Sequence, residues 1–308
     1  MKVIITGRSG LIGSALDARL RSQGHEVVGV SRQPGPGELG WDLDTRSIDA
    51  AGFEGADAVV HLAGETIDGR WTSAKKRRIR QSRVVGTTLV AETIAGLDVP
   101  PAVLVSASAI NYYGDRGHDV ITEQTPPGSS FLAGVCVEWE GAARPAAEAG
   151  VRVVHPRTGI VLTPAGGALA RMLPVFRLFA GGRLGSGEQM WSWITLADEV
   201  AALEYLIEHD LEGPVNLTAP APVSNRQFAA VLGQVLGRPA VLPAPAFALR
   251  TVLGEMAEEL VLTSIDIRPQ VLTRSGFTFA HAELGPALRA VLGDPSSRRR
   301  SEGSDQDG

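Results

Sequence analysis

Cysteine is almost absent from this sequence, because Cys136 is the single one among 308 residues. An internal disulfide is therefore excluded, which fits a reducing compartment. The chain also lacks any apolar run close to the roughly 18 residues of a membrane span, and its start lacks the cationic segment of a secretion signal. We therefore expect a cytoplasmic protein that does not enter a membrane.

Positive charge is scarcer than negative charge: 29 Lys and Arg stand against 34 Asp and Glu, which gives a net charge of −5. A nucleic-acid binder more often carries a basic surface, so no nucleic-acid partner is expected. The six histidines show no metal-ligand spacing, and we expect no metal. A small-molecule substrate is the expected partner, and the sequence does not indicate an oligomeric state.

The start of the chain carries the most informative pattern, an apolar run at 2–6 followed by three glycines spaced three residues apart. The first glycine permits a tight turn, the second admits a pyrophosphate, and the third lets a helix pack on the strand. The N–H groups at the helix start then face the phosphates. A plain turn that uses glycine for steric reasons is the alternative. The pattern predicts a dinucleotide cradle of Thr6, Gly7, Gly10, Leu11, Ile12 and Gly13.

The end of the second apolar run indicates which dinucleotide binds. An NAD site normally has an Asp or Glu there for the ribose 2′-OH, whereas this chain has Ser31 and Arg32. A hydroxyl and a guanidinium suit the 2′-phosphate of NADP, which arginine can meet with two charge-assisted hydrogen bonds. An exposed loop arginine with no ligand is the alternative. The sequence favours NADP over NAD.

Strand-like and helical patterns alternate along the first half of the chain, which predicts an α/β fold with a doubly wound parallel sheet of the Rossmann type. We expect residues 1–160, joined by a strand at 214–218, to form an NADP-binding domain. Residues 161–293 would form a small, mostly helical substrate lobe with a helical extension at about 247–293, and 294–308 a disordered tail. The strands are expected at 2–6, 26–31, 57–62, 102–107 and 151–155, and the helices at 13–23, 73–96 and 130–149.

Residues just after each strand of such a sheet face the cofactor. Small residues after the third strand let the backbone approach the nucleotide. The predicted cofactor contacts there are His61, Leu62, Ala63, Gly64 and Glu65. After the fourth strand, Ser108 with Tyr112 or Tyr113 could orient and protonate a carbonyl. Ser106 is a further cofactor candidate, although a bond to loop backbone is its preferred interpretation. We expect the substrate to contact Arg171, Trp191 and Trp193.

Several of these segments together resemble the extended short-chain dehydrogenase/reductases, the superfamily of nucleotide-sugar epimerases and dehydratases. More narrowly, the chain is similar to the epimerase family related to human short-chain dehydrogenase family 39U member 1. The matching segments are 61–65, 82–87, 139–143, 157–162 and 185–194, and 247–293 resembles the family's helical extension. The resemblance implies NADP near Ser31, Arg32, Leu62, Ala63, Arg83 and Val161.

The chain departs from that superfamily in its catalytic pair. Competent members carry Tyr-x-x-x-Lys on the helix after the fourth strand of this chain, but no tyrosine here precedes a lysine at that spacing. The helix instead offers Leu132 with Cys136, or Cys136 with Glu140. Cys136 or Glu140 could serve as the acid, or each could be structural. We expect an NADP(H)-dependent oxidoreductase or epimerase-like enzyme for a small carbonyl or sugar-like substrate; a non-catalytic NADP(H)-binding sensor or scaffold is the alternative.

Overall fold

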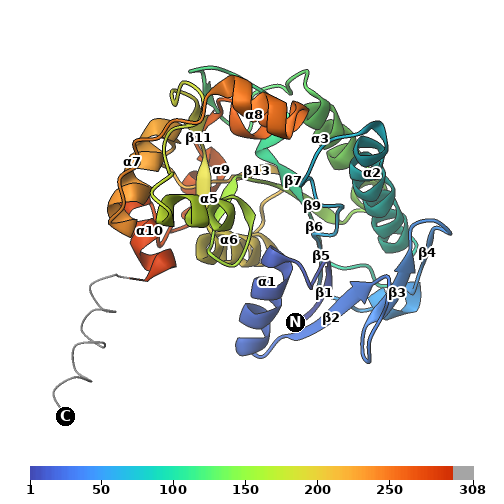
Figure 1. Cartoon of the computed structure of the whole chain (residues 1–308). Coiled ribbons are helices and arrows are strands. Elements are labelled where there is room, and N and C mark those ends of the chain that lie inside the picture. Colours follow the sequence, from blue (N-terminus) through green and yellow to red (C-terminus); the bar gives the residue numbers. More distant parts are fainter. Residues whose placement is uncertain (294–308) are drawn as a thin grey trace, which may run out of the picture.

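A mostly parallel sheet lies at the centre of the protein (Figure 1). The computed structural model describes residues 1–293, so the expected tail at 294–308 lies outside the described residues. The strand order is β13-β9-β6-β5-β1-β2-β3-β4, with β7 paired to β9. The strands are β1 (Lys2–Thr6), β2 (Glu26–Ser31), β3 (Leu39–Asp42), β4 (Ser47–Ile48), β5 (Ala58–His61), β6 (Val103–Ser106), β7 (Ser108–Ala109), β9 (Arg152–Thr158) and β13 (Gly213–Leu217).

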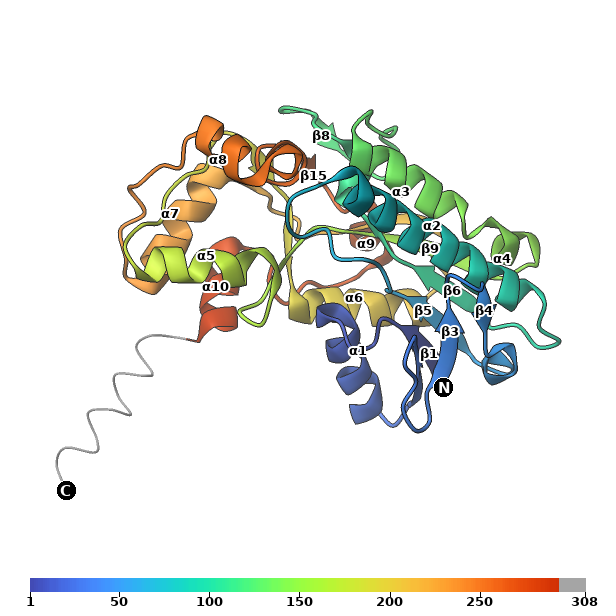
Figure 2. The same cartoon turned by 45° about the vertical axis from the view of Figure 1, so that its right-hand side comes forward.

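Helices cover both faces of this sheet, which confirms the predicted doubly wound fold (Figure 2). Because successive side chains of a strand point to opposite faces, neighbouring residues of β1 enter different cores. Ile5 packs on one face of the sheet, against the helices α1 (Leu11–Ser22) and α6 (Leu196–Glu208). Ile4 packs on the other face with α2 (Ser73–Ala95) and α4 (Arg144–Glu148), and α3 (Phe131–Gly141) lies beside α2. The five predicted strand runs correspond to β1, β2, β5, β6 and β9.

The pairing of β1 determines where a ligand can bind. Its two neighbours are β2 and β5, and the chain order runs in opposite directions on its two sides. Such a reversal opens a crevice at the carboxyl ends of the strands, because the connecting helices leave on opposite faces. The glycine turn therefore lies at the crevice.

The C-terminal half adds short helices and the strands of three two-stranded sheets, one of which is completed by β8 from the N-terminal half. Its helices are α5 (Gly167–Arg177), α7 (Asn225–Leu236), α8 (Ala246–Leu253), a π-helix at Ala257–Val261, α9 (Gln270–Ser275) and α10 (Leu284–Leu292). The sheets are β10 (Ile160–Leu162) with β12 (Trp193–Thr195), β11 (Met190–Trp191) with β14 (Val223–Ser224), and β15 (Asp266–Ile267) with β8 (Val120–Ile121). Short 3-10 helices occur at Ala50–Phe53 and Ile110–Tyr113.

The segment 247–293 packs on three different cores. Leu288 of α10 joins the lobe core with Trp193 and Phe228. Leu272 of α9 lies in the core between the sheet and α6, and Met256 packs with Trp71 near the start of α2. The extension therefore ties the lobe to the sheet. None of the helices between residues 1 and 293 combines the length and apolar character needed to cross a membrane.

Candidate functional site

The glycine turn has the geometry of a close backbone approach. Gly7 has a φ of +72°, and a Cβ there would lie 2.8 Å from the backbone nitrogen of Ala63. A Cβ on Gly13 would lie only 2.3 Å from the carbonyl oxygen of Gly7. Any side chain at either position would therefore force the backbone to move. Gly10 is the N-cap of α1 and has no side chain to cap the helix, which leaves N–H groups of the first turn available for a ligand.

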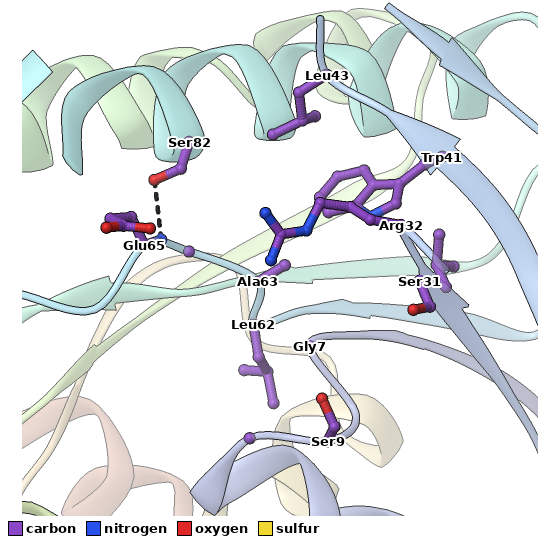
Figure 3. A pocket seen from close by; sticks show the side chains of 13 residues that line it. Gly7, Ser9, Ser31, Arg32, Trp41, Leu43, Leu62, Ala63, Glu65 and Ser82 are labelled. Carbon is purple, nitrogen blue, oxygen red and sulfur yellow. Dashed lines mark hydrogen bonds between the residues drawn. The ribbon is translucent and has the colours of Figure 1, made fainter. Parts of the chain in front are cut away.

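A pocket opens beside this turn at the carboxyl ends of β1, β2 and β5 (Figure 3). The sequence predicted eight of its lining residues, Gly7, Gly10, Ser31, Arg32, Leu62, Ala63, Gly64 and Glu65. It missed five others, Ser9, Val30, Trp41, Leu43 and Ser82. Trp41 and Leu43 come from the short β3–β4 hairpin, where the sequence patterns predicted no strand. The pocket thus brings together residues from the predicted cradle and from elements that sequence spacing could not place.

The pocket lining carries one cation, Arg32, and one carboxylate, Glu65. Figure 3 shows the Arg32 guanidinium pointing into the cavity from the end of β2. Glu65 is the lining carboxylate, and its Oε1 lies 2.7 Å from Lys75 Nζ. This hydrogen bond lowers the pKa of Glu65 and ties its charge to Lys75. The pocket therefore suits an anionic group beside Arg32.

Arg83 lies just behind the pocket wall. Its Nη1 donates to the carbonyl oxygen of Glu65 at 3.0 Å, and a Cβ on Gly64 would lie 3.5 Å from its guanidinium carbon. That carbon also lies 4.9 Å from the ring centre of Trp139. Burial lowers the pKa of Arg83. The arginine therefore braces the Gly64–Glu65 backbone rather than lining this pocket.

Other predicted cofactor contacts lie outside the pocket. Thr6, His61 and Ser106 are fully buried, which contradicts direct side-chain contact with a ligand. The Thr6 hydroxyl lies 2.7 Å from His61 Nδ1 and accepts from the Ala63 N–H, so the pair positions the backbone after β5. Burial lowers the pKa of His61 to about 4, which keeps the ring neutral. Leu11, Ile12, Gly13 and Val161 also do not line the described pocket.

The predicted catalytic residues enter a buried polar network. Ser108 Oγ donates to Glu140 Oε1 at 2.7 Å. Arg157 donates two hydrogen bonds of 2.8 Å to the same carboxylate and a third, of 2.9 Å, to the Tyr113 hydroxyl. Tyr113 in turn donates to Asn216 Oδ1 at 2.7 Å. Every partner is supplied from within the protein, so the network holds β7, α3 and β9 together.

The two tyrosines differ in accessibility. Tyr113 has no exposed surface, and burial raises its pKa to about 12, so the structure argues against it as a proton donor to a substrate. Tyr112 is half-buried, and the Arg157 guanidinium carbon lies 3.4 Å from its ring centre. Of the two, only Tyr112 has solvent-exposed surface.

The helix α3 carries no exposed acid at the positions expected for the catalytic pair. Cys136 is buried, and burial raises the pKa of its thiol to about 12. The Glu140 carboxylate accepts hydrogen bonds from Arg157 and Ser108. Leu132 packs with Trp71 and Met256. These surroundings give all three residues structural contacts.

The three predicted substrate contacts separate in space. Trp193 is fully buried and Trp191 is 5% exposed, and both lie in the lobe core. Both indoles therefore serve the packing of the lobe, and their contact with a substrate stays a prediction. Arg171 is exposed on α5, and its Nη2 lies 2.5 Å from Asp68 Oδ2, which links the lobe to the loop after β5.

Comparison with known proteins identifies the relatives of this chain. Residues 3–218 match the NAD dependent epimerase/dehydratase family, and residues 244–291 match a domain of unknown function, DUF1731. An epimerase family protein of Mycobacterium bovis is 45% identical over 290 residues, which cover 93% of this chain and 96% of that protein. The human epimerase family protein SDR39U1 is 35% identical over 297 residues, covering 95% of this chain and 100% of that protein. The crystal structure of human SDR39U1 (isoform 2) with NADPH superposes with a TM-score of 0.88 at 34% identity, over 94% of this chain and 99% of that one.

Proposed function

Because the chain belongs to the NAD dependent epimerase/dehydratase family, we propose that it binds NADP(H) in the pocket beside the glycine turn. The observation that carries the proposal is the pair Ser31 and Arg32 at the pocket, where an NAD site has a carboxylate. The NADPH in the crystal structure of the human relative supports it. The turn would hold the pyrophosphate, and Ser31 and Arg32 the 2′-phosphate.

We propose that the bound cofactor serves an oxidoreductase or epimerase-like reaction on a small carbonyl or sugar-like substrate. NADPH supplies a hydride in such reactions. The chain must then deliver a proton, and Tyr112 and Ser108 are the proposed donors. Tyr112 is half-buried, whereas Ser108 is 4% exposed and donates its proton to Glu140, so Ser108 would exchange a proton through that carboxylate.

A non-catalytic NADP(H) sensor or scaffold is the second candidate. The observation that favours it is the burial of Tyr113 and Cys136, both with pKa values raised to about 12. A protein that retained the glycine turn without an exposed acid would bind the cofactor and leave it unchanged. Such a protein would function through a change of conformation when NADP(H) binds, and it would convert no substrate.

We also propose that residues 1–160 with β13 form the nucleotide domain and that 161–293 form the substrate lobe. All lining residues of the pocket precede residue 83, which supports this division. The single, buried cysteine supports a reducing, cytoplasmic compartment.

Arg32→Ala tests the cofactor assignment. Losing a charge-assisted phosphate contact costs roughly 1.5–3 kcal/mol, so NADPH should bind about ten- to a hundredfold more weakly while NADH changes little. Nicotinamide fluorescence titration measures both affinities. Arg144→Ala is the matched control, because that exposed arginine forms an ion pair with Glu148 on α4 and does not line the pocket. Equal NADPH and NADH affinities in the unmodified protein would refute the NADP assignment.

Loading the protein with NADPH and adding a panel of small carbonyl compounds separates the two candidate functions. An enzyme should oxidise the bound NADPH, which is followed by its absorbance, and Tyr112→Phe should slow this about 10²–10⁴-fold with unchanged cofactor affinity. Ser108→Ala tests the second donor in the same assay. Bound NADPH that stays reduced with every compound would favour the sensor.

A further inference from the structure

Arg8 of the glycine turn reaches across to the loop that follows β2. Its Nη2 forms a short ion pair with Glu38 Oε1, and its Nη1 lies 3.6 Å from Asp17 Oδ1 on α1. Glu38 also accepts from the Gly35 N–H at 2.9 Å. Arg8 therefore connects the turn to the loop that begins with Arg32.

The strand β2 fixes where this ion pair lies. A Cβ on Gly29 would be 2.5 Å from Arg8 Nε and 2.9 Å from Glu38 Oε1, so both charged groups cross the strand at that residue. Side chains two residues apart on a strand share a face and are separated by about 7 Å. The pair therefore lies one pleat away from Ser31, on the same side of β2.

The charge of Glu38 matters at this distance. Its hydrogen bond from Gly35, and then its bond to Arg8, lower the pKa of Glu38, so it is ionised at neutral pH. Its side chain is only 19% exposed, and solvent screens its field incompletely. Without a partner, this carboxylate would repel a 2′-phosphate beside Ser31 and tolerate the uncharged 2′-OH of NADH.

We propose that Arg8 is a second determinant of NADP preference, because it neutralises Glu38 next to the site of the 2′-phosphate. The inference rests on the proposed NADP(H) function and adds a residue that does not line the pocket. Arg32 meets the phosphate directly, and Arg8 acts through Glu38. Asp17, which also pairs with Arg21 at 2.9 Å, is the other carboxylate facing Arg8.

Four proteins test this role: the unmodified chain, Arg8→Ala, Glu38→Gln and the double variant. NADPH and NADH affinities are measured by fluorescence titration, with circular dichroism and thermal unfolding as checks of folding. Arg8→Ala should weaken NADPH about tenfold and NADH little, since a bare charge acts on a doubly charged phosphate about 7 Å away. The double variant should regain most of that loss, because the repelling carboxylate is gone. Arg144→Ala again controls for the loss of one positive charge.

The outcomes distinguish this inference from the function on which it rests. Equal binding of NADPH and NADH by the unmodified chain would overturn the proposed NADP preference itself. A wild-type preference that survives Arg8→Ala would overturn only the role of Arg8. A loss in Arg8→Ala that Glu38→Gln does not restore would refute neutralisation of Glu38. Recovery in the double variant supports it.

Discussion

Replacing Gly10 by valine should separate cofactor binding from folding. The backbone at Gly10 has φ −75° and ψ 173°, an extended conformation that valine adopts without strain. A Cβ there would meet the Gly7 carbonyl oxygen at 3.2 Å, and Gly10 otherwise faces the pocket. The added side chain would therefore occupy the space proposed for the pyrophosphate while the turn gives by a few tenths of an ångström.

We expect Gly10→Val to change the stability of the protein little and its affinity for NADPH strongly. Valine is a poor residue at a helix N-cap, which costs about 1 kcal/mol. That cost corresponds to a fall in Tm of about 2–4 °C. Steric exclusion of the pyrophosphate should weaken NADPH by more than about a hundredfold, which is about 2.7 kcal/mol. Gly13→Ala should show the opposite pattern, a marked loss of stability, because its Cβ would lie 2.3 Å from the Gly7 carbonyl oxygen.

Nicotinamide fluorescence titration and thermal unfolding of the same samples measure both effects. Gly134→Val is the control, since a Cβ at that position on α3 meets nothing within 4 Å. It should bind NADPH normally. A Gly10→Val protein that melts as expected and binds NADPH with unchanged affinity would show that the pyrophosphate does not lie at the turn.

Two further variants test buried groups. Tyr113→Phe removes the hydrogen bonds that the hydroxyl forms with Arg157 Nη1 and Asn216 Oδ1, so the free energy of unfolding should fall by about 1–3 kcal/mol; an unchanged denaturation midpoint would contradict the network. Burial raises the pKa of Glu199 to about 8, above about 4.3 in the unfolded chain. The raised pKa stabilises the folded protein fully below about pH 4.3, and this stabilisation is lost as the pH rises toward 8. Over that range the free energy of unfolding of the wild type should fall, relative to Glu199→Gln, by up to about 1.4 kcal/mol per pH unit. Unfolding at pH 5, 6.5 and 8 measures this, and parallel pH profiles of the two proteins would disprove it.

The sequence by itself determined the features that are local in the chain. The strand, the glycine turn and the start of α1 are contiguous, so the residue types and their spacing predict the geometry directly. The same holds for Ser31 and Arg32, which end one strand. The alternation of apolar strands with helices was sufficient to predict the doubly wound sheet.

Tertiary structure alone decided which polar and aromatic side chains face the site. Tyr113 and Trp193 follow or form strands as candidate ligand contacts do, yet packing of the lobe and of α3 buries both completely. Trp41 and Ser82 reach the pocket from a hairpin and a helix that are distant from the glycine turn in the sequence. The pairing of Arg8 with Glu38 likewise joins residues 30 positions apart. Exposure and pairing depend on contacts between distant segments, and the spacing of residues within one segment carries no information about them.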